Sequence, residues 1–368
     1  MANDNTARTA VSVYGRGAGA STAARASVGP TVSTNSGDSA KQPTFIFDRF
    51  LERHLRYTKK RIVYHPSEIT TLCLTAEVDF KKHYKDESCV VKIKRLPLYI
   101  VGDIHGNWRQ LLRVFNVLGL PGDKAYLFLG DYINAYYGFR EELKTRFNLG
   151  DADSVYKHIN SVFRYLPLCA VVAGEKILLK ALKLPRDIVA QQRDTTLPKN
   201  FFPQEHPLDL DILWADPNGD VDGFEYNEAR QSSVWFGPQE VYATCERLGV
   251  KLIVRAHQAF NRGFGFFAGK RLVTLFGATD YVVKGSFAGI LHLQLGKAQD
   301  KKGNPNGKDE IQAGIILFRP ATKETKGKQK FIQEYENFPE AEEDEETQLE
   351  ILGKVNEFFL VHLKFVDT

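Results

Sequence analysis

Short apolar runs alternate with longer amphipathic stretches along the middle of the chain. Apolar residues that recur at three- and four-residue intervals predict helices, whereas short runs rich in Val, Ile, Leu and Phe predict buried strands. The predicted helices are 45–57, 66–80, 109–118, 154–163 and 238–248. The predicted strands are 96–102, 125–130, 169–179, 251–255, 271–276, 287–295 and 312–318. This order predicts an α/β fold in which loops at strand ends carry the site residues.

Both ends of the chain differ from this middle part. Residues 1–43 are rich in Ala, Ser, Thr and Gly and hold few large apolar side chains, so we expect a disordered tail. Residues 44–330 form the expected folded domain. Residues 331–368 are expected to be an acidic linker and an amphipathic helix, because apolar side chains between 349 and 366 recur at helical spacing.

Composition narrows the class of protein. The 368 residues are 43% hydrophobic, which is enough to build one large core. Lys and Arg outnumber Asp and Glu by 49 to 45, and the resulting net charge of +4 is too small to predict a nucleic-acid surface. The four cysteines show no paired spacing, and no apolar run reaches the roughly eighteen residues that span a bilayer. The sequence therefore predicts a soluble cytoplasmic or nuclear protein with no membrane or nucleic-acid partner.

Two of the predicted strands end in the same Gly-Asp pair. Residues 101–107 read Val-Gly-Asp-Ile-His-Gly-Asn, and residues 127–132 read Leu-Phe-Leu-Gly-Asp-Tyr. Asp103 and His105 lie two residues apart just past a strand, so both side chains can reach one cation. Asp131, at the end of the next strand, can bridge to a second cation. The pattern therefore indicates a metal site.

With these motifs the chain resembles the serine/threonine protein phosphatases of the phosphoprotein phosphatase family, and among them the type-1 enzymes. The further family motifs are Asp211-Ile-Leu-Trp-Ala-Asp-Pro217, Asn227-Glu-Ala-Arg230, Val254-Arg-Ala-His-Gln258, Arg271-Leu-Val-Thr-Leu-Phe276 and Ala278-Thr-Asp-Tyr281. They occur in the family's order, so a chance match is very improbable. The resemblance implies a calcineurin-like metallophosphoesterase β-sandwich flanked by helices.

In that family two divalent cations, about 3.5–4 Å apart, hold a hydroxide that attacks the phosphoester, arginines bind the phosphoryl oxygens and a histidine protonates the leaving group. The resemblance also assigns roles to residues of this chain. The implied positions are Asp103 and His105 for the first cation, Asp131 as the bridge, His257 for the second cation, Arg230 for phosphate, Tyr281 beside the bridging water and Asp216 as a supporting carboxylate.

One block of the family pattern is absent. After Gly-Asp-Tyr the family continues with Val-Asp-Arg-Gly, a helix, a strand and Gly-Asn-His-Glu before it reaches Ile-Asn-x-x-Tyr-Gly-Phe. Here Tyr132 is followed at once by Ile133-Asn-Ala-Tyr-Tyr-Gly-Phe139, so on the order of thirty residues, one strand-helix unit, are missing. The resemblance implies that a phosphate-binding arginine, an asparagine ligand of the second cation and the His-Asp general acid are lost with this block.

A second departure from the family lies further along the chain. Ala181 stands where the family has a histidine ligand of the second cation. Of the nine histidines only His105 precedes a glycine and none follows an asparagine, so neither lost motif is present elsewhere. Loss of the general acid alone removes ~10²–10⁴ of the rate. We therefore expect a pseudophosphatase that binds at most one divalent cation, either Mn²⁺ or an ion of the Fe/Zn type.

Other interpretations stay open. The retained ligands fit a residual metal-dependent phosphoesterase that uses water as its proton donor, and the clean junction after Tyr132 fits a skipped exon or a gene-model error. The ligands at the strand ends also fit a structural ion or ordinary hydrogen bonds to loops, and Arg230 and Tyr281 fit structural roles equally well. Without its partner ligands, His257 is expected to be a hydrogen-bonded buried histidine.

A protein-binding surface is the last expectation from the sequence. Type-1 phosphatases recruit regulators through an apolar groove remote from the metals, and the resemblance assigns part of this groove to Leu252, Phe266 and Val273. The same residues also fit plain core strands. The expected partners are regulatory proteins or phosphoprotein substrates.

Overall fold

We analysed a computed structural model of the whole chain. The residues that the structure describes are 12–14, 47–55, 62–83, 90–133, 138–172, 177–179, 207–281, 283–299, 305–320, 350–355 and 358–363. No helix within these ranges is both long and apolar enough to cross a membrane.

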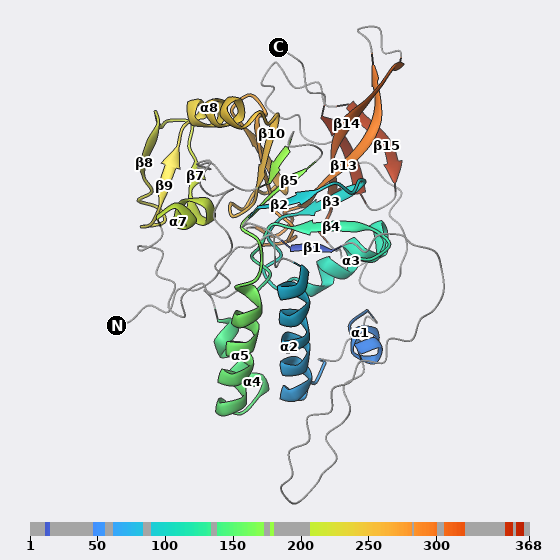
Figure 1. Cartoon of the computed structure of the whole chain (residues 1–368), viewed down its shortest axis with the longest axis vertical. Helices are drawn as coiled ribbons and strands as arrows, with labels where there is room; N and C mark the ends of the chain where they lie inside the picture. The colour runs from blue at the N-terminus through green and yellow to red at the C-terminus, as the bar shows by residue number, and fades with distance from the viewer. Residues whose placement is uncertain are drawn as a thin grey trace, which may run out of the picture.

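Two large sheets form the centre of the fold (Figure 1). The seven-stranded sheet has the order β1 (Ser12–Tyr14), β4 (Ala125–Phe128), β3 (Leu98–Val101), β13 (Ala288–Gln299), β14 (Pro305–Phe318), β16 (Phe358–Leu363) and β15 (Glu350–Val355). The six-stranded sheet has the order β11 (Phe264–Phe267), β12 (Leu272–Leu275), β10 (Leu252–Arg255), β6 (Ile177–Leu179), β5 (Cys169–Val172) and β2 (Val90–Ile93). A smaller sheet has the order β7 (Asp216–Pro217), β9 (Val234–Phe236) and β8 (Phe224–Tyr226).

The main hydrophobic core lies between the two large sheets. It combines buried side chains of one sheet, such as Ile100 and Leu291, with buried side chains of the other, such as Val172 and Leu252. Each of these strands also carries buried residues on its opposite face, so the sheets need a cover on both sides. The fold is therefore a β-sandwich whose outer faces are closed by helices.

Helices supply that outer cover. The helix α3 (Trp108–Leu118) packs Val114 and Leu118 against the outer face of the seven-stranded sheet. On the far side, α8 (Pro238–Leu248) packs Val241 and Cys245 against the six-stranded sheet, with α7 (Pro207–Trp214) beside it. This arrangement confirms the predicted α/β, calcineurin-like β-sandwich flanked by helices.

A separate group of helices extends from one end of the sandwich (Figure 1). Its members are α2 (Pro66–His83), α4 (Phe139–Arg146) and α5 (Leu149–Phe163). The short helix α1 (Phe47–Leu55) is tied to the start of α2 by an ion pair between Arg53 and Glu68 at 2.8 Å. Leu143, Ala152 and Val155 form the small core of this group. Two of its helices, α4 and α5, come soon after Ile133 in the sequence, close to where the family block is absent.

Two expectations about the chain ends were wrong where the structure describes them. Three residues of the predicted disordered tail form β1, which pairs antiparallel with β4. The predicted C-terminal helix is instead the strand pair β15 and β16, and β16 pairs with β14. The run from Phe358 to Leu363 is apolar at almost every position, and β14 offers it a partner edge that no local periodicity reveals.

Candidate metal centre

The ends of two neighbouring parallel strands create the candidate metal centre. Because β3 and β4 run parallel, Asp103 and Asp131 emerge at the same edge of the sheet. The backbone N–H groups of Ile104 and His105 donate to the Asp131 carbonyl at 3.1 and 2.8 Å, which ties the two loops together. His105 and Asp131 both adopt positive φ, at 47° and 41°, a conformation that non-glycine residues rarely take. The two sharp turns aim both side chains at one point.

Three side chains converge at this point as the sequence predicted. The ligand atoms of Asp103, His105 and Asp131 all lie within 4.8 Å of one another. Asp103 is fully buried, and Nδ1 of His105 is buried without a hydrogen-bond partner. Burial lowers the pKa of the His105 imidazole, an effect that the Asp131 carboxylate opposes, so the neutral form that binds metals is favoured. Two carboxylates and one imidazole fit a divalent cation such as Mn²⁺, Fe²⁺ or Zn²⁺.

His257 approaches the same cluster from the end of β10. Its Nδ1 lies 3.9 Å from Oδ2 of Asp131, and its backbone N–H donates to Oδ2 of Asp103 at 2.8 Å. The ring packs edge-on against Trp214. Its Nε2 is buried and has no hydrogen-bond partner, and the role of His257 stays a prediction. Burial lowers the pKa of this imidazole, and the Asp131 carboxylate opposes the change.

A buried ion-pair network supports His257. Asp216 accepts from Nη2 of Arg255 and from Nε of Arg230, both at 2.9 Å. Burial alone would raise the pKa of the Asp216 carboxyl, but the guanidinium groups of Arg255 and Arg230 outweigh it and hold the pKa below its ordinary value. Asn227 donates to the same carboxylate at 3.2 Å. Asp216 is therefore the centre of this network, whereas its supporting role at a metal site and phosphate binding by Arg230 stay predictions.

Tyr281 covers one side of the centre. Its ring stacks on the His105 imidazole, with the ring centroids 4.5 Å apart and an angle of 11° between the planes. Tyr281 is 39% exposed, so it forms part of the rim rather than of the buried interior. The stack places Tyr281 beside His105, and its expected place beside a bridging water stays a prediction.

Close backbone approach holds the centre together. Asp103 forms an isolated parallel bridge with Phe276, and the N–H of Gly277 donates to the Asp103 carbonyl at 2.9 Å. A Cβ atom on Gly102 would overlap the carbonyl of Leu275, so only glycine fits where the two sheets meet. The first glycine of the Gly-Asp motif thus sets the distance between the sheets at the site.

Known proteins share both the sequence pattern and the fold. The pattern of the calcineurin-like phosphoesterase family matches residues 96–260. The serine/threonine-protein phosphatase PP1-delta of Caenorhabditis elegans is 30% identical over 250 residues, which are 58% of this chain and 79% of that protein. The chain belongs to the serine/threonine protein phosphatase family.

A second relative and one solved structure are also similar to this phosphatase-family chain. The serine/threonine-protein phosphatase C23G10.1 of the same worm is 34% identical over 239 residues, which are 55% of this chain and about half (51%) of that protein. A solved structure of a protein serine/threonine phosphatase from Saccharomyces cerevisiae, with similarity to human phosphatase PP5, superposes with a TM-score of 0.57. It covers 73% of this chain and 96% of that chain at 19% identity, so it supports the fold alone.

The predicted docking groove is not exposed in this phosphatase-family domain. Leu252 and Val273 are fully buried in the core between the sheets, and Phe266, which pairs with Val273 across β11 and β12, is only half-buried. A peptide could therefore reach Phe266 alone among the three residues. The arrangement corresponds to the plain core strands that the sequence left open.

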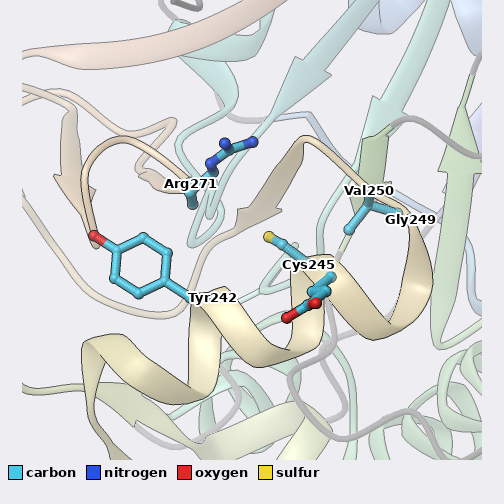
Figure 2. Close-up of a pocket in the computed structure, with 6 residues that line it drawn as sticks. Tyr242, Cys245, Gly249, Val250 and Arg271 are labelled. Atoms are coloured by element: carbon cyan, nitrogen blue, oxygen red, sulfur yellow. The ribbon is translucent and has the colours of Figure 1, made fainter. Parts of the chain in front are cut away.

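A shallow hollow of about 330 Å³ lies elsewhere, between α8 and the start of β12 (Figure 2). It is lined by Tyr242, Cys245, Glu246, Gly249, Val250 and Arg271. It contains none of the candidate site residues. Burial raises the pKa of the Cys245 thiol to about 11, so this thiol is protonated at neutral pH and is not a nucleophile there.

Sequence reasoning missed several residues of the centre and could not test others. Asn107 accepts from the N–H of Gln110 as the N-cap of α3 and donates to the Thr279 carbonyl at 3.3 Å. An asparagine directly before an amphipathic helix is the signal that could have found it. Arg255 was also missed, although a charge in the apolar strand Leu252–Arg255 signals a buried partner. Ala181 lies outside the described residues.

Proposed function

We propose that this chain is a serine/threonine phosphatase-like domain with impaired hydrolysis, which acts by binding phosphorylated or regulatory proteins. One observation carries the proposal: within the described ranges, the three ligands at the ends of β3 and β4 are the one group of acidic, histidine or cysteine side chains close enough to hold a cation. The sequence adds that the family's general-acid histidine and two ligands of the second cation are absent.

When bound, a divalent cation would supply Lewis-acid charge and a lowered pKa of its water. The residues of this chain would hold that cation through Asp103, His105 and Asp131. They would orient a phosphate group with Arg230 at the edge of the site. Within the described part of the chain they offer no positioned acid for the leaving alkoxide, because the His257 ring faces Asp131 at 3.9 Å and packs edge-on against Trp214. Binding without efficient turnover follows from this set of groups.

Residual phosphoester hydrolysis is the second candidate function. The observation that favours it is the position of His257, which faces Asp131 at 3.9 Å with Nε2 lacking a hydrogen-bond partner. His257 thus adds an imidazole close to the three-ligand group. In this case water would protonate the leaving group, and turnover would be slow.

Hydrolysis of a phosphoserine peptide separates the two candidates. The full chain is assayed with Mn²⁺ alongside Asp131→Asn and an intact type-1 phosphatase. We expect no turnover above that of Asp131→Asn, together with binding of the phosphopeptide in preference to its unphosphorylated form. Mn²⁺-dependent turnover that Asp131→Asn abolishes would establish the second candidate. Equal binding of both peptides would remove the phosphoprotein-binding function.

The number of bound cations is a separate prediction. Asp103, His105 and Asp131 should hold at most one divalent ion per chain, because the asparagine and one histidine ligand of the second ion are absent. Elemental analysis after dialysis against Mn²⁺ measures this ratio, with Asp103→Asn as the control. Two tightly held ions per chain would show that other side chains replace the lost ligands.

We further propose regulatory proteins as partners and a cytoplasmic or nuclear location. The location is supported by the scattered cysteines, of which Cys73 and Cys245 are buried in the structure. Fluorescence microscopy of the tagged full chain tests it, and secretion into the medium would contradict it.

A further inference from the structure

The main chain of His257 is held from both sides by charged side chains. Its N–H donates to Oδ2 of Asp103 at 2.8 Å, and its carbonyl accepts from Nη2 of Arg230 at 3.1 Å. Between these two bonds His257 has φ of 80°, which a residue with a side chain rarely adopts. Such a conformation persists only where its surroundings enforce it. Here the hydrogen bonds from His257 to Asp103 and from Arg230 to His257 hold this backbone conformation.

Arg230 is itself fixed in place by a second layer of contacts. Its Nε donates to Asp216 at 2.9 Å, and its backbone N–H donates to Oδ1 of Asn227 at 3.0 Å. Asp216 is held in turn by Arg255, whose side chain is 7% exposed and also donates to the Ala215 carbonyl at 3.0 Å. The guanidinium of Arg230 thus has one donor on a buried carboxylate and another on the His257 carbonyl.

We propose that Arg230 is a positioning residue for the cation site: it holds the His257 main chain so that the imidazole faces Asp131 as a fourth donor beside Asp103, His105 and Asp131. The inference rests on the proposed one-cation site and adds a role for a residue that touches no cation. A purely structural ion pair would end at Asp216. Here the same side chain reaches past Asp216 to the backbone of the histidine.

Titration of the full chain with Mn²⁺ alone tests this role. The variants are Arg230→Met, His257→Ala and the double variant. Arg140→Met is the matched control, because Arg140 belongs to the helical group and forms an exposed ion pair with Asp153. We expect Arg230→Met to weaken Mn²⁺ binding about tenfold, the size typical of groups that orient a ligand. In the His257→Ala background the same change should cause no further loss, and Arg140→Met should change nothing.

Arg230→Lys is a second variant in case Arg230→Met fails to fold. Lysine keeps the positive charge, but its single ammonium group cannot donate to both Asp216 and the His257 carbonyl, as Nε and Nη2 of Arg230 do. This variant should weaken Mn²⁺ binding as Arg230→Met does, with a native circular dichroism spectrum. Equal losses from Arg230→Met with and without His257 would overturn the proposal, since they would show a general structural effect. Undiminished Mn²⁺ binding in both Arg230 variants would overturn it as well.

A second readout separates this inference from the proposed cation site. The ¹⁵N chemical shifts of the His257 ring in the metal-free protein report its surroundings, and Arg230→Met should move them while Arg140→Met should not. If the wild-type chain bound no Mn²⁺, the one-cation site would be wrong, and the ring shifts would still decide whether Arg230 positions His257. Unchanged ring shifts in Arg230→Met would refute the positioning role.

Discussion

Replacing Arg255 by methionine should destabilise the domain more than any surface substitution. Arg255 is 6% exposed and donates to Oδ1 of Asp216, to the Ala215 carbonyl and to Oε1 of Gln258, at 2.9, 3.0 and 2.7 Å. Methionine fills similar volume but leaves three buried acceptors, on Asp216, Ala215 and Thr274, without this donor. Removing one partner of a buried ion pair typically costs about 3–5 kcal/mol. Because Arg230 still serves the other oxygen of Asp216, we expect about 3 kcal/mol.

Equilibrium unfolding in urea measures this loss, with Arg140→Met as the control at an exposed ion pair, where we expect less than about 1 kcal/mol. The double variant Arg255→Met, Asp216→Leu should lose less than the sum of its single changes, because it removes both charges together. A loss below about 1 kcal/mol for Arg255→Met, or strict additivity in the double variant, would refute the reasoning that the pair is a desolvated unit.

Two other predictions concern the helical group and the junction of the sheets. The hydrogen bond from Lys81 holds the pKa of Glu77 below its ordinary value of 4.5, so this stabilisation is complete above that value and is lost as pH falls through the lowered pKa. Glu77→Gln should cost less than about 1 kcal/mol at pH 7, and unfolding curves of wild type and variant should converge once the pH falls below the lowered pKa of Glu77; a gap that widens in acid would contradict this. Gly102→Ala should cost about 1–3 kcal/mol in urea unfolding because its Cβ would overlap the Leu275 carbonyl, whereas Gly219→Ala, with open space around it, should be nearly neutral; equal stability of the two variants would show that the junction is not tight.

The sequence by itself determined the elements whose signals are local. Helix α8 begins and ends where its proline and apolar spacing predicted, and α3 begins one residue earlier than expected, after its asparagine cap. The two Gly-Asp motifs also determined that Asp103 and Asp131 meet, because adjacent parallel strands end at one edge. The ordered motifs likewise determined the phosphatase family, because residue types and their spacing can be read without the packed structure.

Tertiary structure alone decided the features that depend on distant partners. Helical spacing near the C-terminus gave way to β15 and β16, because the edge of β14 provides backbone hydrogen bonds that no local pattern records. Leu252 and Val273 proved to be core residues, since burial depends on the opposite sheet. The clamp on His257 likewise joins Asp103, 154 positions away, and Arg230, 27 positions away. Spacing along the chain cannot show such contacts, because they depend on how both sheets and the strand β7 pack against one another.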